Sequence, residues 1–294
     1  MPANPVLPLR ARVSGFVALT KPRIIELLLV TTVPTMFVAR QGVPSVWLMV
    51  ATVLGGTLAA GGANAVNMVV DRDIDSLMER TRERPLVTGV MTPRAALVFA
   101  VTLEVAAFAW LLATVNLLSA VLAVSATFFY VFVYTLWLKR TSTQNIVIGG
   151  AAGAVPVLVG WSAVTNSLAW APVVLFLVMF FWTPPHFWAL AIKYRDDYAA
   201  AGVPMLPAVA SLEETASRII LYTVILVALS VVFAPVAGMG LLYLVSALVL
   251  GAVFGAFALA VRRDPGERTA MRLFTYSITY ITLLFGAITL DVVV

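Results

Sequence analysis

Long apolar segments separated by short polar ones fill almost the whole chain. As helices rising about 1.5 Å per residue, these segments can cross a bilayer core about 30 Å thick. They cover residues 24–40, 46–70, 94–113, 117–137, 146–164, 168–191, 219–236, 239–261 and 273–291. The pattern predicts an all-α fold, a polytopic membrane bundle of about nine transmembrane helices that forms a single domain over residues 1–294.

The connections between these segments alternate in character. One set is short and nearly uncharged, whereas the other is polar and comprises 71–93, 139–145, 192–218 and 262–272. Of the 19 Lys and Arg residues, 18 lie in the polar connections, at the ends of the segments that border them, or in the N-terminal tail. Only Arg40 lies next to a connection of the uncharged set. Basic loops are retained on the cytoplasmic side of membranes. We therefore expect the N-terminus and the large loops 71–93 and 192–218 in the cytoplasm.

Composition narrows the class of protein further. Hydrophobic residues make up 62% of the chain and charged residues 11%, against about 25% charged residues in soluble domains. The absence of cysteine excludes disulfides and thiolate chemistry, and the single histidine excludes a site built from several. The net charge of +5 is explained by loop orientation, so we expect no nucleic-acid partner. Residues 1–20 lack signal- or transit-peptide features, which favours a bacterial inner (plasma) membrane.

The segment 64–86, NAVNMVVDRDIDSLMERTRERPL, carries the clearest chemical pattern. Asn67, Asp71 and Asp75 follow one another at four-residue intervals, so on a helix they form one stripe, with Asp73 on the far side. Two carboxylates on one face repel each other unless a cation lies between them. Oxygen ligands favour Mg²⁺, which often binds one or two carboxylates together with substrate phosphates.

Arginines follow the stripe between Arg72 and Arg84 and supply positive charge for a nearby anion. A metal ion and arginines at a membrane surface indicate a diphosphate with an apolar tail. The second large loop resembles the first, because Lys193, Arg195, Asp196 and Asp197 lie at its start. Two acidic clusters on one membrane face can hold two metal ions around one diphosphate, although an ordinary solvated loop explains the second cluster equally well by itself.

His186 lies within an apolar segment, directly after Pro184 and Pro185. An intramembrane histidine either contacts a ligand or bridges helices by hydrogen bonding, and both interpretations stay open here. The neighbouring Trp182 suits a flat aromatic substrate, although ordinary core packing also explains it. Glu104 lies in the middle of another apolar segment, and the sequence identifies no partner for it.

The stripe Asn67-x3-Asp71-x3-Asp75 resembles the first aspartate-rich motif of the UbiA superfamily of intramembrane prenyltransferases. The extended form DRDIDSLMERTRERPL is similar to the subgroup that farnesylates haem b. The same subgroup is indicated by TKPRIIELLL at 20–29, LKRTSTQNIVIGGAAGAVPVLVGW at 138–161 and WTPPHFWALAIKYRDDYAAAGVPMLP at 182–207.

This resemblance implies a helical bundle around a central cavity, with farnesyl diphosphate and haem b as substrates, haem o and diphosphate as products, and Mg²⁺ as cofactor. It implies that Asn67, Asp71, Asp75 and Asp197 are the catalytic and metal-binding residues. We assign contact with haem to His186, a candidate axial ligand of the iron, and to Trp182. The resemblance and the local charges together assign the diphosphate to six basic residues: Lys21, Arg23, Arg80, Arg84, Lys139 and Lys193.

One departure from the superfamily concerns the second motif, which in many members has two aspartates four residues apart. Here Lys193 stands four residues before Asp197. Either a second Mg²⁺ still binds, or Lys193 replaces it electrostatically. Beyond the bilayer and the two substrates, the resemblance points to haem a synthase or oxidase assembly factors as partners.

Three other functions fit parts of the sequence. A related prenyltransferase acting on a quinone precursor or a chlorophyll-type ring shares the metal site and differs only in its acceptor. A transporter of a lipid or an anion also places acids in helices, but it needs polar groups near the bilayer midplane rather than at one face. A haem chaperone without catalysis leaves the carboxylate stripe unexplained.

Overall fold

The computed structural model describes the backbone of residues 9–294 and the side chains of residues 10–22 and 30–294. All regular elements in this range are helical. In chain order they are α1 (Leu9–Thr20), α2 (Pro22–Arg40), α3 (Val46–Val70), α4 (Arg72–Leu77), α5 (Pro93–Thr114), α6 (Leu117–Phe128), the π-helix η1 (Phe129–Leu138), α7 (Lys139–Thr141), α8 (Asn145–Thr165), α9 (Trp170–Lys193), α10 (Arg195–Ala200), α11 (Leu206–Val209), α12 (Leu212–Ala237), α13 (Leu241–Arg263) and α14 (Glu267–Val293).

Eight helical stretches among the described residues are long and apolar enough to cross a membrane. One of them, Leu117–Thr141, combines α6, η1 and α7. The ninth expected segment, residues 24–40, corresponds to α2, which has 19 residues. The prediction of an all-helical membrane protein is confirmed, and its count of about nine is close. The largest shift in a boundary is at α12, which begins at Leu212 rather than 219. Ser211 caps this helix by accepting a hydrogen bond of 3.0 Å from the backbone N–H of Glu214, so a polar first turn precedes the apolar part.

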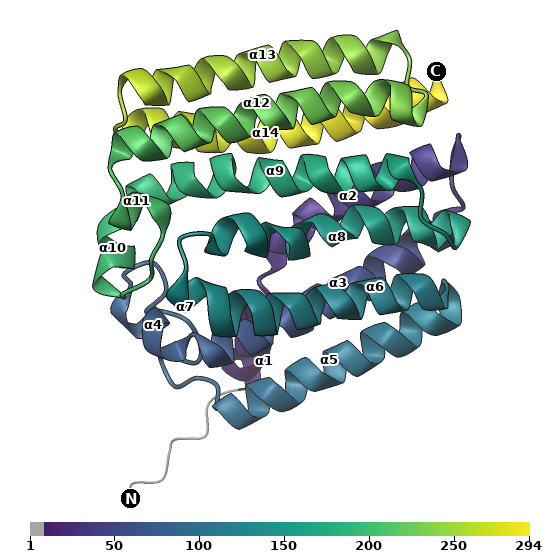
Figure 1. Cartoon of the computed structure of the whole chain (residues 1–294). Coiled ribbons are helices and arrows are strands. Elements are labelled where there is room, and N and C mark those ends of the chain that lie inside the picture. The colour runs from purple at the N-terminus through teal and green to yellow at the C-terminus, as the bar shows by residue number, and fades with distance from the viewer. Residues whose placement is uncertain (1–8) are drawn as a thin grey trace, which may run out of the picture.

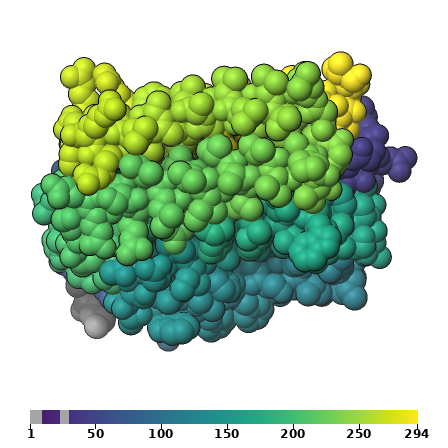
Figure 2. All heavy atoms as spheres, turned by 45° about the horizontal axis from the view of Figure 1, so that its top comes forward, coloured from purple at the N-terminus to yellow at the C-terminus, as the bar shows by residue number. Residues whose placement is uncertain are grey.

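The long helices lie in successive layers across the bundle (Figure 1). α13 packs on α12 and α14, and α9 packs on α8, α12 and α14. On the opposite side α3 packs on α5, while α2 contacts α3, α8 and α14 and so joins the two sides. α12 and α13 cover one face of the molecule, shown in green and yellow-green in Figure 2, and expose large apolar side chains there, among them Leu221, Val224, Leu248 and Val249. Such a face is suited to contact with lipid tails.

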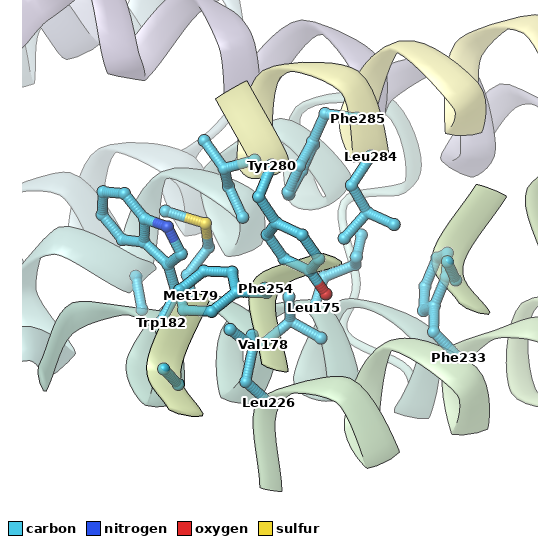
Figure 3. Packing of buried hydrophobic residues seen from close by; sticks show 14 of the residues in the cluster. Leu175, Val178, Met179, Trp182, Leu226, Phe233, Phe254, Tyr280, Leu284 and Phe285 are labelled. Carbon is cyan, nitrogen blue, oxygen red and sulfur yellow. The ribbon is translucent and has the colours of Figure 1, made fainter. Parts of the chain in front are cut away.

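The largest apolar core lies between α8, α9 and the three C-terminal helices. In Figure 3 Trp182 and Met179 of α9 lie close to Phe254 of α13 and Tyr280 of α14, all of them buried. The buried hydroxyl of Tyr280 lies 2.7 Å from that of Ser230, which satisfies both polar groups inside the core. This core fixes α9 against α14, which matters for His186.

A smaller apolar cluster lies beneath the two large polar loops. Ile74 and Met78 of the first loop pack there with Tyr198, Val203 and Met205 of the second. The cluster holds the two loops together at one end of the bundle, as the alternation of polar connections predicts.

Candidate functional site

The stripe of Asn67, Asp71 and Asp75 is present in the structure, across the junction of α3 and α4. The backbone N–H of Asp71 donates to the carbonyl of Asn67 at 2.9 Å, and that of Asp75 donates to the carbonyl of Asp71 at 2.8 Å. The helical hydrogen bonds therefore continue through the break in regular helix at Asp71, and the three side chains keep a common face. Their exposed fractions are 3%, 0% and 2%, whereas Asp73 faces away and is exposed.

The side-chain amide of Asn67 is bonded on every side. Lys21 Nζ donates to its Oδ1 at 2.8 Å. Its Nδ2 donates to Asp71 Oδ2 at 2.7 Å and to Thr135 Oγ1 at 3.2 Å. These contacts connect the start of α2, the end of α3 and the π-helix η1, and they fix which way the amide oxygen points.

The two oxygens of the Asp71 carboxylate have different surroundings. Oδ2 accepts hydrogen bonds from Asn67 and from the ammonium group of Lys139. Oδ1 is buried and receives no hydrogen bond from any described residue, and the guanidinium of Arg140 lies 3.8 Å from it through Nη2. A buried carboxylate oxygen that accepts no hydrogen bond is costly, and a bound cation would satisfy it.

Asp75 is held by the turn that follows it. Arg84 Nη1 donates to Asp75 Oδ2 at 2.6 Å, and the hydroxyl of Thr81 donates to the Asp75 carbonyl at 3.0 Å. The chain therefore folds back after α4, so that an arginine nine residues later reaches the stripe. Sequence reasoning includes Arg84 in the site but not Thr81.

Basic groups outnumber the buried carboxylates in this cluster. Asp75 pairs with Arg84 and Asp71 with Lys139, while Lys21 bonds to the amide oxygen of Asn67 in the same stripe. Burial, with the neighbouring charges of Arg84 and Lys139, lowers the pKa of Lys21 to about 7. An excess of partly desolvated positive charge favours an anionic ligand.

Arg140 was not among the predicted site residues, yet it borders the stripe. Its guanidinium donates two bonds of 2.7 Å to Asp73 and one of 3.0 Å to the Val70 carbonyl. The bond from Arg140 lowers the pKa of Asp73 to about 2. The signal that could have identified it is its position directly after Lys139, on the helix end that faces the stripe.

The second loop meets the first but keeps a separate set of contacts. Asp197 Oδ2 accepts a long bond of 3.5 Å from the backbone N–H of Arg80, whose guanidinium lies 5.6 Å from the centre of the Tyr194 ring. Lys193 pairs with Glu267 at 3.1 Å, at the start of α14. Asp196 is exposed, and the side chain of Arg23 lies outside the described residues.

His186 is buried between α9 and α14. Its ring stacks on Trp182, with centroids 4.3 Å apart, and on Phe274 at 4.6 Å. His186 Nδ1 lies 2.7 Å from Ser277 Oγ, and the Ser277 hydroxyl donates to the Phe274 carbonyl at 2.6 Å. When the serine proton lies on the Phe274 carbonyl, the neutral tautomer that satisfies this contact is the one protonated at Nδ1, which leaves a lone pair on Nε2. The indole of Trp182 donates to the Ser277 carbonyl at 2.8 Å.

Glu104 has one partner for two carboxyl oxygens. Thr127 Oγ1 donates to Oε1 at 3.0 Å, whereas Oε2 is buried without a hydrogen bond from the described residues. The bond to Thr127 does not connect Glu104 to the stripe.

Sequence comparison gives close matches over nearly the full length of the chain. The UbiA prenyltransferase family matches residues 28–284. The protoheme IX farnesyltransferase of Streptomyces avermitilis is 55% identical over 290 residues, which cover 97% of this chain and 95% of that protein. The protoheme IX farnesyltransferase of Parafrankia sp. (strain EAN1pec) is 58% identical over 280 residues, 94% and 90% of the two chains.

Solved structures with the same fold are more distant in sequence. A digeranylgeranylglyceryl phosphate synthase matches with a TM-score of 0.79 at 16% identity, covering 96% of this chain and 99% of the other. A UbiA homolog from Archaeoglobus fulgidus, bound to DMAPP and Mg²⁺, matches with a TM-score of 0.61 at 17% identity, covering 94% and 99%. At these identities the structures support the fold.

Proposed function

This chain belongs to the UbiA prenyltransferase family, and we propose that it transfers the farnesyl group of farnesyl diphosphate to a vinyl group of haem b, giving haem o and diphosphate. The protoheme IX farnesyltransferases that match over nearly the full length of the chain support the choice of donor and acceptor. Within the structure, the observation that carries the proposal is the buried Oδ1 of Asp71, which accepts no hydrogen bond from the described residues although it lies in an oxygen-rich stripe bordered by cationic side chains.

The residues of the stripe suit a magnesium ion. Asp71, Asp75 and Asn67 offer only oxygen ligands, and among the described side chains no group of three or more His, Cys, Asp or Glu forms a complete protein cage. Such an incomplete set is what Mg²⁺ uses when substrate phosphates supply further ligands. When bound, the ion supplies charge neutralisation on the diphosphate oxygens.

The basic groups then have a second task. Lys139 and Arg84 now neutralise Asp71 and Asp75, and an ion on these carboxylates would release them to contact the diphosphate. Together with Lys21 they stabilise the negative charge that grows on the leaving group as the allylic C1–O bond of farnesyl diphosphate breaks. Arg23, Arg80 and Lys193 complete the proposed basic set, and Asp197 is the proposed ligand on the second loop.

The acceptor reaction needs a dry, flat pocket and then one water molecule. The electron pair of a haem vinyl group forms the new C–C bond to C1 of the farnesyl group, and water adds to the remaining cationic carbon and loses a proton. A dry pocket protects the allylic cation from premature hydrolysis. We assign haem contact to Trp182 and to His186, whose Nε2 lone pair suits an axial bond to iron.

We also propose where the enzyme works. Residues 1–294 act as one transmembrane domain in the inner (plasma) membrane, with the N-terminus and the loops 71–93 and 192–218 on the cytoplasmic side. The exclusion of basic loops from the opposite side supports this orientation. Haem a synthase or oxidase assembly factors are the proposed protein partners.

Incubating membranes that contain the protein with farnesyl diphosphate and either haem b or 4-hydroxybenzoate tests the acceptor. We expect haem o, detected by mass, only with haem b, and no product with the Asp71→Asn variant. Prenylated 4-hydroxybenzoate alone would instead identify a quinone-pathway enzyme. Movement of intact farnesyl diphosphate into sealed vesicles without product would identify a transporter.

A further inference from the structure

We propose that Thr135 is a positioning residue that orients the amide of Asn67 for binding the metal–diphosphate pair; this inference rests on the proposed function. Thr135 lies in the π-helix η1, is fully buried, and contacts Asn67 Nδ2 through its hydroxyl oxygen at 3.2 Å. π-Helical turns are rare and frequently occur at functional sites.

The direction of these hydrogen bonds is determined. The Thr135 hydroxyl donates its single proton to the carbonyl of Tyr130, five residues earlier in η1, at 2.8 Å. Its oxygen can therefore only accept from Asn67, so the amide nitrogen faces η1 and Oδ1 faces the opposite way, towards Lys21. An amide turned by 180° would set its oxygen against Asp71 Oδ2 and would leave Thr135 without its donor.

Of the three partners of Asn67, Thr135 is the one that the proposed ligands do not engage. Lys21 and Asp71 are charged groups that the proposed function brings into contact with diphosphate and metal. The hydroxyl of Thr135 is neutral and is tied to the backbone of its own helix. It is thus the partner that holds the same amide orientation before and after binding.

The neighbouring helix keeps η1 in place. A Cβ atom added at Gly149 of α8 would lie 2.3 Å from the Tyr134 ring, so α8 and η1 approach closely next to Thr135. This contact limits movement of η1 and makes the position of the hydroxyl well defined.

Calorimetric titration of the purified full-length protein with a non-cleavable farnesyl diphosphate analogue, in Mg²⁺ and in EDTA, tests the inference. Thr135→Val removes the hydroxyl at nearly constant volume, and we expect it to weaken Mg²⁺-dependent binding about 5- to 10-fold, the loss of one buried hydrogen bond. Thr135→Ser should stay within about twofold of the wild type. Thr215→Val is the matched control, because Thr215 is also fully buried but its hydroxyl donates to the carbonyl of Ser211, the N-cap of α12, at 3.0 Å, far from the stripe.

A double-mutant cycle separates positioning from general packing. In an Asn67→Ala background Thr135→Val should cause no further loss. An equal loss in that background, or wild-type binding by Thr135→Val alone, would overturn the role of Thr135 while the proposed function stands. Wild-type binding that is the same in EDTA as in Mg²⁺ would overturn the proposed metal site, and the inference with it.

Discussion

The helices that lead into the two large polar loops, α3 and α9, end in different environments although their sequences suggest equivalent ones. At the end of α3, the buried carboxylates of Asp71 and Asp75 pair with basic side chains: Lys139 of α7 and Arg84 of the turn after α4. α9 carries a neutral stack of His186 with aromatic rings, and the acids that follow it are partly or fully exposed. Under the proposed function, the two ends divide the work: α3 serves the charged diphosphate donor and α9 serves the flat haem acceptor.

The largest effect that tests this division is expected at Asp71. Asp71→Asn keeps the shape but removes the charge that a cation needs, so farnesyl transfer should fall at least about 100-fold. Haem o formation by membranes with equal amounts of protein measures it. Near-normal turnover would show that the first loop does not hold the metal.

A selective effect is expected at His186. His186→Ala should raise the KM for haem b about tenfold, because one good contact of about 1.4 kcal/mol is lost, and should leave the affinity for the farnesyl diphosphate analogue unchanged. Ser277→Ala, which removes the group that fixes the His186 proton, should act in the same direction and more weakly. Equal losses for both substrates would assign His186 to helix bridging alone.

A smaller effect is expected from the second loop. Among the described residues, Asp197 is joined to the first loop by one long hydrogen bond, from the Arg80 backbone. Asp197→Asn should therefore change the Mg²⁺ concentration for half-maximal activity by only a few-fold, within about 1 kcal/mol. A loss as large as that of Asp71→Asn would mean that the two loops contribute equally, with a second ion at Asp197.

The smallest effect is expected at Asp73, which faces away from the stripe. Its pKa is lowered to about 2, so its pairing with Arg140 stabilises the fold above the usual carboxyl pKa near 4 and is lost as pH falls towards 2. The group is exposed, so Asp73→Asn should cost less than about 1 kcal/mol at pH 7 and leave activity within about twofold. Thermal unfolding in detergent at pH 7 and pH 3 measures the stability; a large loss of activity would place Asp73 in the site.

Most of the fold and the carboxylate stripe of the candidate site can be predicted from the sequence. Apolar length predicts the spans, and four-residue spacing predicts the shared face of Asn67, Asp71 and Asp75, because both depend on local helix geometry. The partners that come from distant segments were harder to predict. Thr135 depends on a π-helix, and the Lys193–Glu267 pair depends on how α9 packs against α14, so neither has a local signature.

The measurement that tests the account most directly is the affinity for a non-cleavable farnesyl diphosphate analogue, measured by calorimetry on the wild type and on Asp71→Asn. We expect tight binding by the wild type in Mg²⁺ and at least about 100-fold weaker binding both in EDTA and by the variant. Equal affinity in Mg²⁺ and EDTA would contradict the central claim that buried carboxylates at the end of α3 bind the diphosphate through a divalent ion.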